Sequence, residues 1–176
     1  MPAPLSASIV IVAAVLLLML IELQLSVFNE RALRAKGAVE PPDDVIGWMR
    51  IAYPVAFLLM GIEAAAGGPL SRDWVIGGLL LFGWAKALKF WAMAHLGSRW
   101  TFRVLVLPGV PLVSSGPYRF LRHPNYAAVI GELIAVAIAL QAPVSGIAAT
   151  LAFGWLIWRR IQVEERALSG QTTTGP

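Results

Sequence analysis

The segment GPYRFLRHPNY, residues 116–126, concentrates the side chains best suited to chemistry in this chain. Two arginines, one histidine, two tyrosines and two prolines fall within eleven positions, directly before an apolar run. Pro124 favours a helix start, because a proline at the first helical position has no N–H that needs a partner. His123 is then the cap, where amide N–H groups and the helix dipole attract an anion such as a carboxylate, with Arg119 and Arg122 as further donors. The alternative is a structural helix start whose arginines hold lipid phosphates.

A pair of carboxylates, Glu164 and Glu165, closes the last apolar run. Carboxylates are unfavourable at the C-terminus of a helix, where the dipole prefers cations. A structural interpretation is an ion pair within the helix, because Arg160 lies one turn before Glu164. The functional interpretation is that the carboxylates face a helix N-terminus. The carboxylates would then bind the ammonium of an amino acid zwitterion, and the helix N-terminus would bind its carboxylate.

Four ionisable residues lie inside apolar runs: Glu22, Lys86, Lys89 and Glu132. Charges at membrane depth cost a few kcal/mol or more, so they face a cavity or one another. Lys86 and Lys89 share one helix face, and we expect them to extend to the membrane surface or to pair with Glu22. Glu132 follows His123 by about two and a half turns, and we predict that it faces a cavity.

The composition indicates a small integral membrane protein. Hydrophobic residues make up 58% of the 176 positions and charged residues 14%, against about half and a quarter in soluble domains. Cysteine is absent and only two histidines occur, so we expect no disulfide, no thiolate chemistry and no metal site. The net charge of +4 comes from basic residues between apolar runs, which favours a membrane over nucleic acid as the partner.

Five apolar segments predict an all-α fold of five transmembrane helices, since unpaired backbone groups are costly in hydrocarbon. The last two segments are only about 16 residues long, or some 24 Å, and are short of a hydrocarbon core of about 30 Å. We therefore expect a helical hairpin whose ends extend past the apolar limits. The segments are Leu5–Phe28, Val45–Ala66, Trp74–His95, Tyr126–Gln141 and Val144–Trp158.

Basic residues follow the first, third and fifth segments, which places the N-terminus outside and the C-terminus in the cytoplasm. The first segment lacks a basic leader and is too long for a signal peptide, so it is interpreted as a retained span. The hairpin of the last two segments then turns at the outer face. Its two open ends, RHPNY and RRIQVEERAL, are expected to meet at the cytoplasmic face.

GPYRFLRHPNY followed by a span, a short turn, a second span and RIQVEERAL resembles the isoprenylcysteine carboxyl methyltransferase-like family. Its members are integral membrane methyltransferases that use S-adenosylmethionine. The resemblance extends over about residues 96–168, which implies a cofactor-binding catalytic core there, after a first part of three helices in residues 1–95. The polar tail, residues 169–176, is predicted to be disordered.

The sequences HLGSRWT and VLPGVPLV are further similar to a bacterial subgroup that accompanies type III polyketide synthases and O-methylates alkylpyrones or alkylresorcinols. Eukaryotic isoprenylcysteine enzymes have more spans and commonly RHP-S-Y. The acceptor that the resemblance implies is thus lipophilic, either a carboxylate or a phenol or enol.

Carried over by position, the resemblance implies a role for nine residues. Arg160 matches an arginine near the reacting carboxylate, and a carboxylate acceptor needs no base. A phenol or enol benefits from a general base, for which Glu132 and His123 are candidates. The residues implied to bind S-adenosylmethionine are Gly116, Pro117, Tyr118, His123, Tyr126, Glu164 and Glu165.

Three other functions remain open from the sequence. One is N-methylation of a phospholipid, because phospholipid methyltransferases are relatives of the family. A second is an NADPH-dependent sterol-reductase-like enzyme, which shares a related C-terminal membrane core. The third is a small transporter or scaffold without enzyme activity, in which Glu22, Lys86 and Lys89 provide an ion path.

Overall fold

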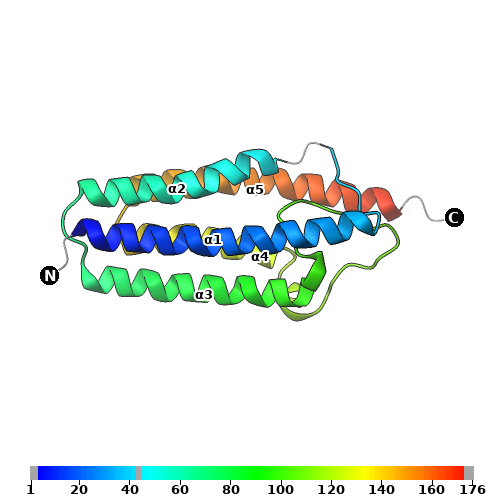
Figure 1. Cartoon of the computed structure of the whole chain (residues 1–176), viewed down its shortest axis with the longest axis horizontal. Coiled ribbons are helices and arrows are strands. Elements are labelled where there is room, and N and C mark those ends of the chain that lie inside the picture. The colour runs from blue at the N-terminus through cyan, green and yellow to red at the C-terminus, as the bar shows by residue number, and fades with distance from the viewer. Residues whose placement is uncertain (1–3, 43–44, 173–176) are drawn as a thin grey trace.

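Five α-helices run side by side along the long axis of the molecule (Figure 1). The computed structural model describes residues 4–42 and 45–172. Among these there is no strand, only an isolated bridge between Val39 and Val106. The predicted all-α fold of five helices is thus confirmed. The helices are α1 (Pro4–Ala35), α2 (Ile46–Ala66), α3 (Arg72–Leu96), α4 (Pro124–Leu140) and α5 (Pro143–Thr172), and one-turn 3₁₀ helices lie at Gly97–Arg99 and Gly116–Arg119.

Three of the helices are long and apolar enough to cross a membrane: α1, α2 and α3. α4 is apolar but has only 17 residues. The α1–α2 and α3–α4 connections lie at the same end as the C-terminus, and the N-terminus lies at the other end (Figure 1). The basic residues of these two connections therefore gather at one end of the bundle, which we call the loop end. The count of five spans and their orientation stay predictions.

The α4–α5 hairpin has the predicted form. α4 begins at Pro124 with His123 as its N-cap residue, and ends at Gln141, whose left-handed backbone (φ 52°, ψ 43°) turns the chain. α5 continues to Thr172, well past the apolar limit that the sequence suggested. Residues 169–172 are therefore helical, which corrects the start of the predicted disordered tail, and residues 173–176 lie outside the described residues.

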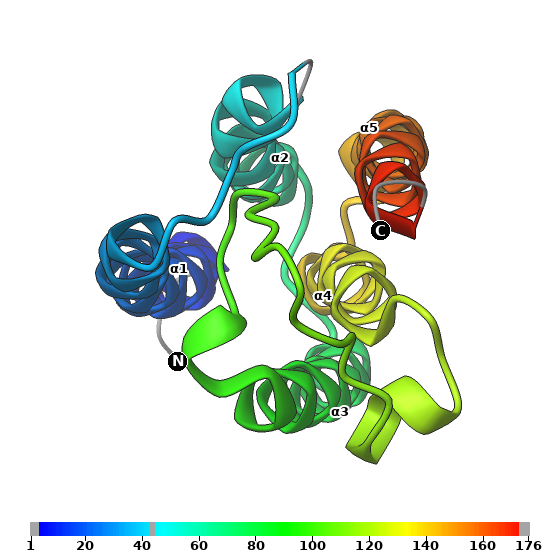
Figure 2. The same cartoon turned by 90° about the vertical axis from the view of Figure 1, so that its right-hand side faces the viewer.

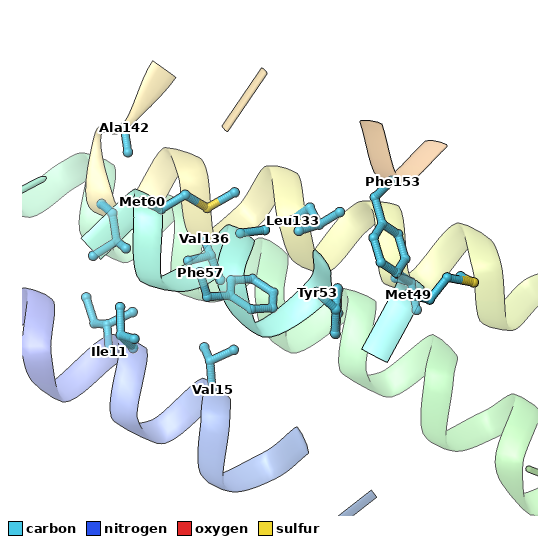
Figure 3. Close-up of a cluster of buried hydrophobic side chains, with 14 of the residues drawn as sticks. Ile11, Val15, Met49, Tyr53, Phe57, Met60, Leu133, Val136, Ala142 and Phe153 are labelled. Carbon is cyan, nitrogen blue, oxygen red and sulfur yellow. The ribbon is translucent and has the colours of Figure 1, made fainter. Parts of the chain in front are cut away.

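The apolar core lies around α2, where it packs against α1, α4 and α5 (Figure 3). Phe57 and Met60 of α2 and Leu133 of α4 are fully buried. Ile11 and Val15 of α1 cover them from one side. In a bilayer the surrounding lipid is equally apolar, so these side chains stabilise the bundle mainly by close packing.

Small residues allow α3 and α4 to approach closely. A Cβ added to Gly78 of α3 would lie 2.4 Å from the amide nitrogen of Ala139. A Cβ added to Gly131 of α4 would likewise lie 3.1 Å from the Cβ of Ala85 in α3. Close backbone approach of this kind is how helices associate when burial of apolar surface gives little driving force.

The segment between α3 and α4 folds into the loop end, within a ring formed by α1, α2, α4 and α3 (Figure 2). Its backbone is held by α1, because Asn29 donates to the Trp100 carbonyl at 2.8 Å and Ser26 Oγ accepts from the Phe102 amide at 2.7 Å. The bridge between Val39 and Val106 adds two backbone hydrogen bonds of 2.9 and 3.0 Å.

The contact of Gly78 with α4 predicts opposite effects at two adjacent glycines. Gly77→Ala meets no atom within 4 Å, so it should stabilise α3 by up to about 1 kcal/mol. Gly78→Ala forces α3 and α4 apart and should cost at least about 1–3 kcal/mol. The measurement is the apparent midpoint of thermal unfolding in detergent. A midpoint for Gly78→Ala equal to that of Gly77→Ala would contradict the close packing.

The ion pairs of Glu40 predict that acid lowers the stability of the loop end. Burial disfavours the charged form of Glu40, but hydrogen bonds and ion pairs with Arg34 and Arg103 outweigh it and lower the pKa of Glu40. A lowered pKa stabilises the fold above the unfolded value of about 4.3, and this stabilisation disappears as the pH falls through the folded value. The thermal midpoint should therefore fall more steeply with acid in the wild type than in Glu40→Gln. Equal slopes would show that this pair does not hold the segment.

Candidate functional site

A cavity of about 890 Å³ lies at the loop end, between the helices and the segment that folds among them. Its polar wall comes from the start of α4 and the second half of α5. Its apolar wall comes from α1, α2 and the segment 99–114. The cavity is thus lined by α1 and α2 as well as by residues of the predicted catalytic core, residues 96–168.

Tyr126 is the centre of the polar wall. Its hydroxyl donates to Glu164 Oε2 at 2.9 Å and accepts from Arg160 Nε at 2.9 Å. Arg160 is 4% exposed, and its guanidinium also donates to the Phe102 carbonyl and lies 3.7 Å from Met49 Sδ. Arg160 therefore joins α5 to α4, to α2 and to the segment between α3 and α4.

His123 completes this wall. Its ring stacks on Tyr126 with centroids 5.3 Å apart and an angle of 19° between the planes. Its Nδ1 lies 3.8 Å from Glu164 Oε2. Arg122 and Glu165 pair at 3.5 Å on the more exposed rim. The two ends of the hairpin, which lie about forty positions apart, meet as the sequence predicted.

The cavity brings together six of the nine predicted site residues, and the other three lie outside its lining. The roles assigned to them stay predictions. The six residues that line it are Tyr118, His123, Tyr126, Arg160, Glu164 and Glu165.

Gly116 and Pro117 lie behind this lining. Pro117 is buried, and Gly116 has a left-handed backbone (φ +60°). A Cβ on Gly116 would lie 2.4 Å from the ring of His95. The two residues therefore shape the turn that presents Tyr118. Burial and the nearby Glu164 carboxylate raise the pKa of Tyr118, so its hydroxyl stays protonated and can donate a hydrogen bond.

Glu132 belongs to a buried group of charges and does not line the cavity. Lys86 Nζ lies 2.5 Å from Glu22 and 3.1 Å from Glu132. Lys89 Nζ lies 2.7 Å from Glu22 and 3.2 Å from Glu132. We call these four residues the charge ring. The Tyr53 hydroxyl donates to Glu132 Oε2 at 2.7 Å.

The charge ring confirms the predicted pairing of both lysines with Glu22. Glu132 differs from the expectation of a cavity-facing carboxylate, because it neutralises the second positive charge. The charges of the ring lie at one level of the bundle and pair with one another. The alternative of an ion path through Glu22, Lys86 and Lys89 stays a prediction.

Several cavity residues were not predicted as site residues. The segment VLPGVPLV lines the cavity, together with Trp100, Asn125, Tyr53 and Lys89. Trp100 Nε1 donates to Asn125 Oδ1 at 3.4 Å, which ties the segment to the start of α4. The run is apolar, yet its middle residues, 108–112, are exposed, so its composition alone did not reveal its place at the cavity.

Comparison with known proteins identifies one family and two relatives. Residues 78–170 match the isoprenylcysteine carboxyl methyltransferase (ICMT) family. The chain is 30% identical over 140 residues to the uncharacterized protein YpbQ of Bacillus subtilis, which covers 80% of this chain and 83% of the relative. It is also 30% identical over 159 residues to an uncharacterized protein of Haemophilus influenzae, covering 89% and 92%.

No solved structure matches the chain. The family match includes more than half of the residues, from α3 through the hairpin that forms the polar wall. That match, together with the apolar helices, implies a membrane methyltransferase. The chain belongs to the isoprenylcysteine carboxyl methyltransferase family.

Proposed function

We propose that the protein transfers a methyl group from S-adenosylmethionine to a lipophilic acceptor. The observation that carries the proposal is the single cavity with two kinds of wall. Tyr126, Arg160 and Glu164 form a polar wall at the loop end. Apolar side chains of α1 and α2 continue the same cavity into the bundle. A polar cofactor and an apolar acceptor thus have adjoining places.

The polar wall fits the amino acid part of the cofactor. Glu164 and Glu165 supply negative charge for its ammonium, and the N-terminal turn of α4 supplies the positive end of a helix dipole for its carboxylate. The protonated Tyr118 hydroxyl adds a donor. Bound S-adenosylmethionine supplies an electrophilic methyl group on its sulfonium.

The main contribution of the protein to methyl transfer would be to position the two reactants. Alignment of two reactants can lower a barrier by about 7–11 kcal/mol in favourable cases, and Arg160 is fixed by bonds to Tyr126 and Phe102. A carboxylate acceptor would need only such an orienting cation. A hydroxyl acceptor would need a group that takes its proton, and His123 lines the cavity for that role.

The apolar wall gives the acceptor a lateral route. Leu16, Met19, Leu20 and Leu23 of α1 line the cavity across from Pro54 of α2. Leu20 is also 55% exposed on the outside of the bundle, so the cavity reaches the lateral surface there. An alkyl chain can therefore enter from the bilayer while the cofactor enters from the cytoplasm.

The cofactor proposal predicts a specific loss of affinity. Glu164→Gln keeps an oxygen that can accept from Tyr126 but removes the charge, so binding of S-adenosylhomocysteine should weaken about 10-fold or more. Isothermal titration in detergent measures it. Asp73→Asn is the matched control, because Asp73 is exposed at the opposite end of α3. Unchanged affinity in both Glu164→Gln and His123→Ala would count against the proposal.

The lateral route predicts a different effect on the acceptor. Leu20→Trp fills the cavity mouth and should raise the KM for the acceptor several-fold, while the affinity for S-adenosylhomocysteine stays unchanged. Leu17→Trp is the control, since Leu17 is equally exposed on α1 but does not line the cavity. The acceptor for this assay comes from a screen of long-chain acids and phenols with labelled cofactor. Equal effects of the two substitutions would contradict the route.

A further inference from the structure

The turn that precedes α4 has two sides with different surroundings. Its inner side belongs to the site already described, because Pro117 is buried and both Tyr118 and His123 line the cavity. Its outer side consists of residues 119–122, with the sequence RFLR, which we call the outer tip. All four residues of the outer tip are exposed.

The outer tip presents apolar and cationic side chains together. Phe120 is 72% exposed and Leu121 is 44% exposed. Arg122 pairs with Glu165 at 3.5 Å, yet its side chain is 88% exposed. Arg119 lies over the Phe120 ring at 6.0 Å and forms no ion pair with any residue that the structure describes. Apolar side chains flanked by arginines suit the boundary between lipid headgroups and acyl chains.

The position of the outer tip agrees with a place at this boundary. Exposed tryptophans lie toward the loop end on three helices, and tryptophan is enriched at membrane interfaces. They are Trp48 of α2, Trp91 of α3 and Trp158 of α5. Trp158 precedes Arg160 of the polar wall by two residues, so the interface lies near the level of this wall. The one-turn helix Gly116–Arg119 lies at the outer edge of the loop end, beside α3 and α4 and outside the ring (Figure 2).

The fold holds this turn mainly from its inner side. Within the turn, the Pro117 carbonyl accepts from the amides of Phe120 and Leu121 at 3.1 and 3.0 Å. Behind it, Gly116 packs so closely on the ring of His95 that a Cβ would lie 2.4 Å away. A ligand on the outer side would therefore add a constraint that the helices do not supply.

We propose that the outer tip binds the anionic phospholipids of the membrane surface, and that this contact strengthens binding of the cofactor. The two arginines pair with lipid phosphates, while the apolar pair between them enters the edge of the acyl layer. Lipid bound there limits the motion of the turn whose inner side carries Tyr118 and His123. The two sites are then coupled, and the coupling acts equally in both directions. The coupling rests on the proposed function, whereas the lipid contact does not.

Binding of S-adenosylhomocysteine to the full chain in nanodiscs tests the coupling. This ligand has no net charge, so a negative membrane does not by itself concentrate it near the protein. The dissociation constant should be about 5-fold lower in discs with about 30% phosphatidylglycerol than in discs of phosphatidylcholine alone. The difference should disappear in about 0.5 M KCl, because salt screens exposed charges. Arg119→Gln and Phe120→Ser should each reduce it to less than about 2-fold.

Arg31→Gln is the matched control for the charge. It removes one positive charge from an exposed residue of α1 at the same end of the bundle, and it should keep the difference between the two lipids. An equal loss in Arg31→Gln and Arg119→Gln would contradict a specific role of the outer tip. Sodium phosphate added to the phosphatidylcholine discs should have no effect. A phosphate effect as large as that of phosphatidylglycerol would show a site for soluble anions and overturn the membrane contact.

A second measurement detects the lipid contact without the cofactor. The chain has no cysteine, so Phe120→Cys can carry a single fluorescent label. Lipids with a nitroxide near the headgroup should quench this label, and more strongly in discs that contain phosphatidylglycerol. An unquenched label, equal affinities in the two kinds of disc, or a difference that survives both Arg119→Gln and Phe120→Ser would overturn the inference. Absence of S-adenosylhomocysteine binding in every disc would instead overturn the proposed function.

Discussion

A charge inside an apolar bundle needs a partner, and this requirement organises the structure at three levels. Deepest is the charge ring, which ties α1, α3 and α4 together and reaches α2 through Tyr53. Next is Arg160, which joins α5 to α4 and to the segment between α3 and α4. At the loop end, Glu40 holds the same segment through Arg103. Each level binds a different set of helices, so the cavity between them has fixed walls.

Local signals in the sequence were enough to predict the helices and the hairpin. Pro124 marks the start of α4, and the apolar runs and the Gln141–Gly146 break mark the spans, because proline geometry and hydrocarbon burial act over a few residues. The meeting of RHPNY with RIQVEERAL followed from topology alone. The extension of α5 past Trp158 was also expected, because its apolar part is too short to cross a hydrocarbon core, but its end at Thr172 was not, since the polar residues 169–176 were predicted to be a disordered tail.

The position of Glu132 is a feature that the sequence alone did not predict. The depth of Glu132 in the membrane follows from counting residues along the helix. Its neighbours, however, depend on how each helix is rotated about its axis. They also depend on how closely α3 and α4 approach, which Gly78 and Gly131 decide. One clue was present. Two lysines at i and i+3 cannot both be neutralised by Glu22 alone, so a second carboxylate at similar depth was the natural partner. The segment 99–114 has no periodicity that could reveal its place in the cavity.

Two groups of polar residues line the cavity, one at the loop end and one beside the charge ring. The loop-end wall offers both signs of charge within a few ångströms, in Arg160 and Glu164, and this suits a zwitterion. The other group is Lys89 and Tyr53, which are held by Glu22 and Glu132 of the charge ring. Together, the hydrogen bonds and ion pairs of these two groups connect all five helices, so the cavity lies between elements whose relative positions they hold.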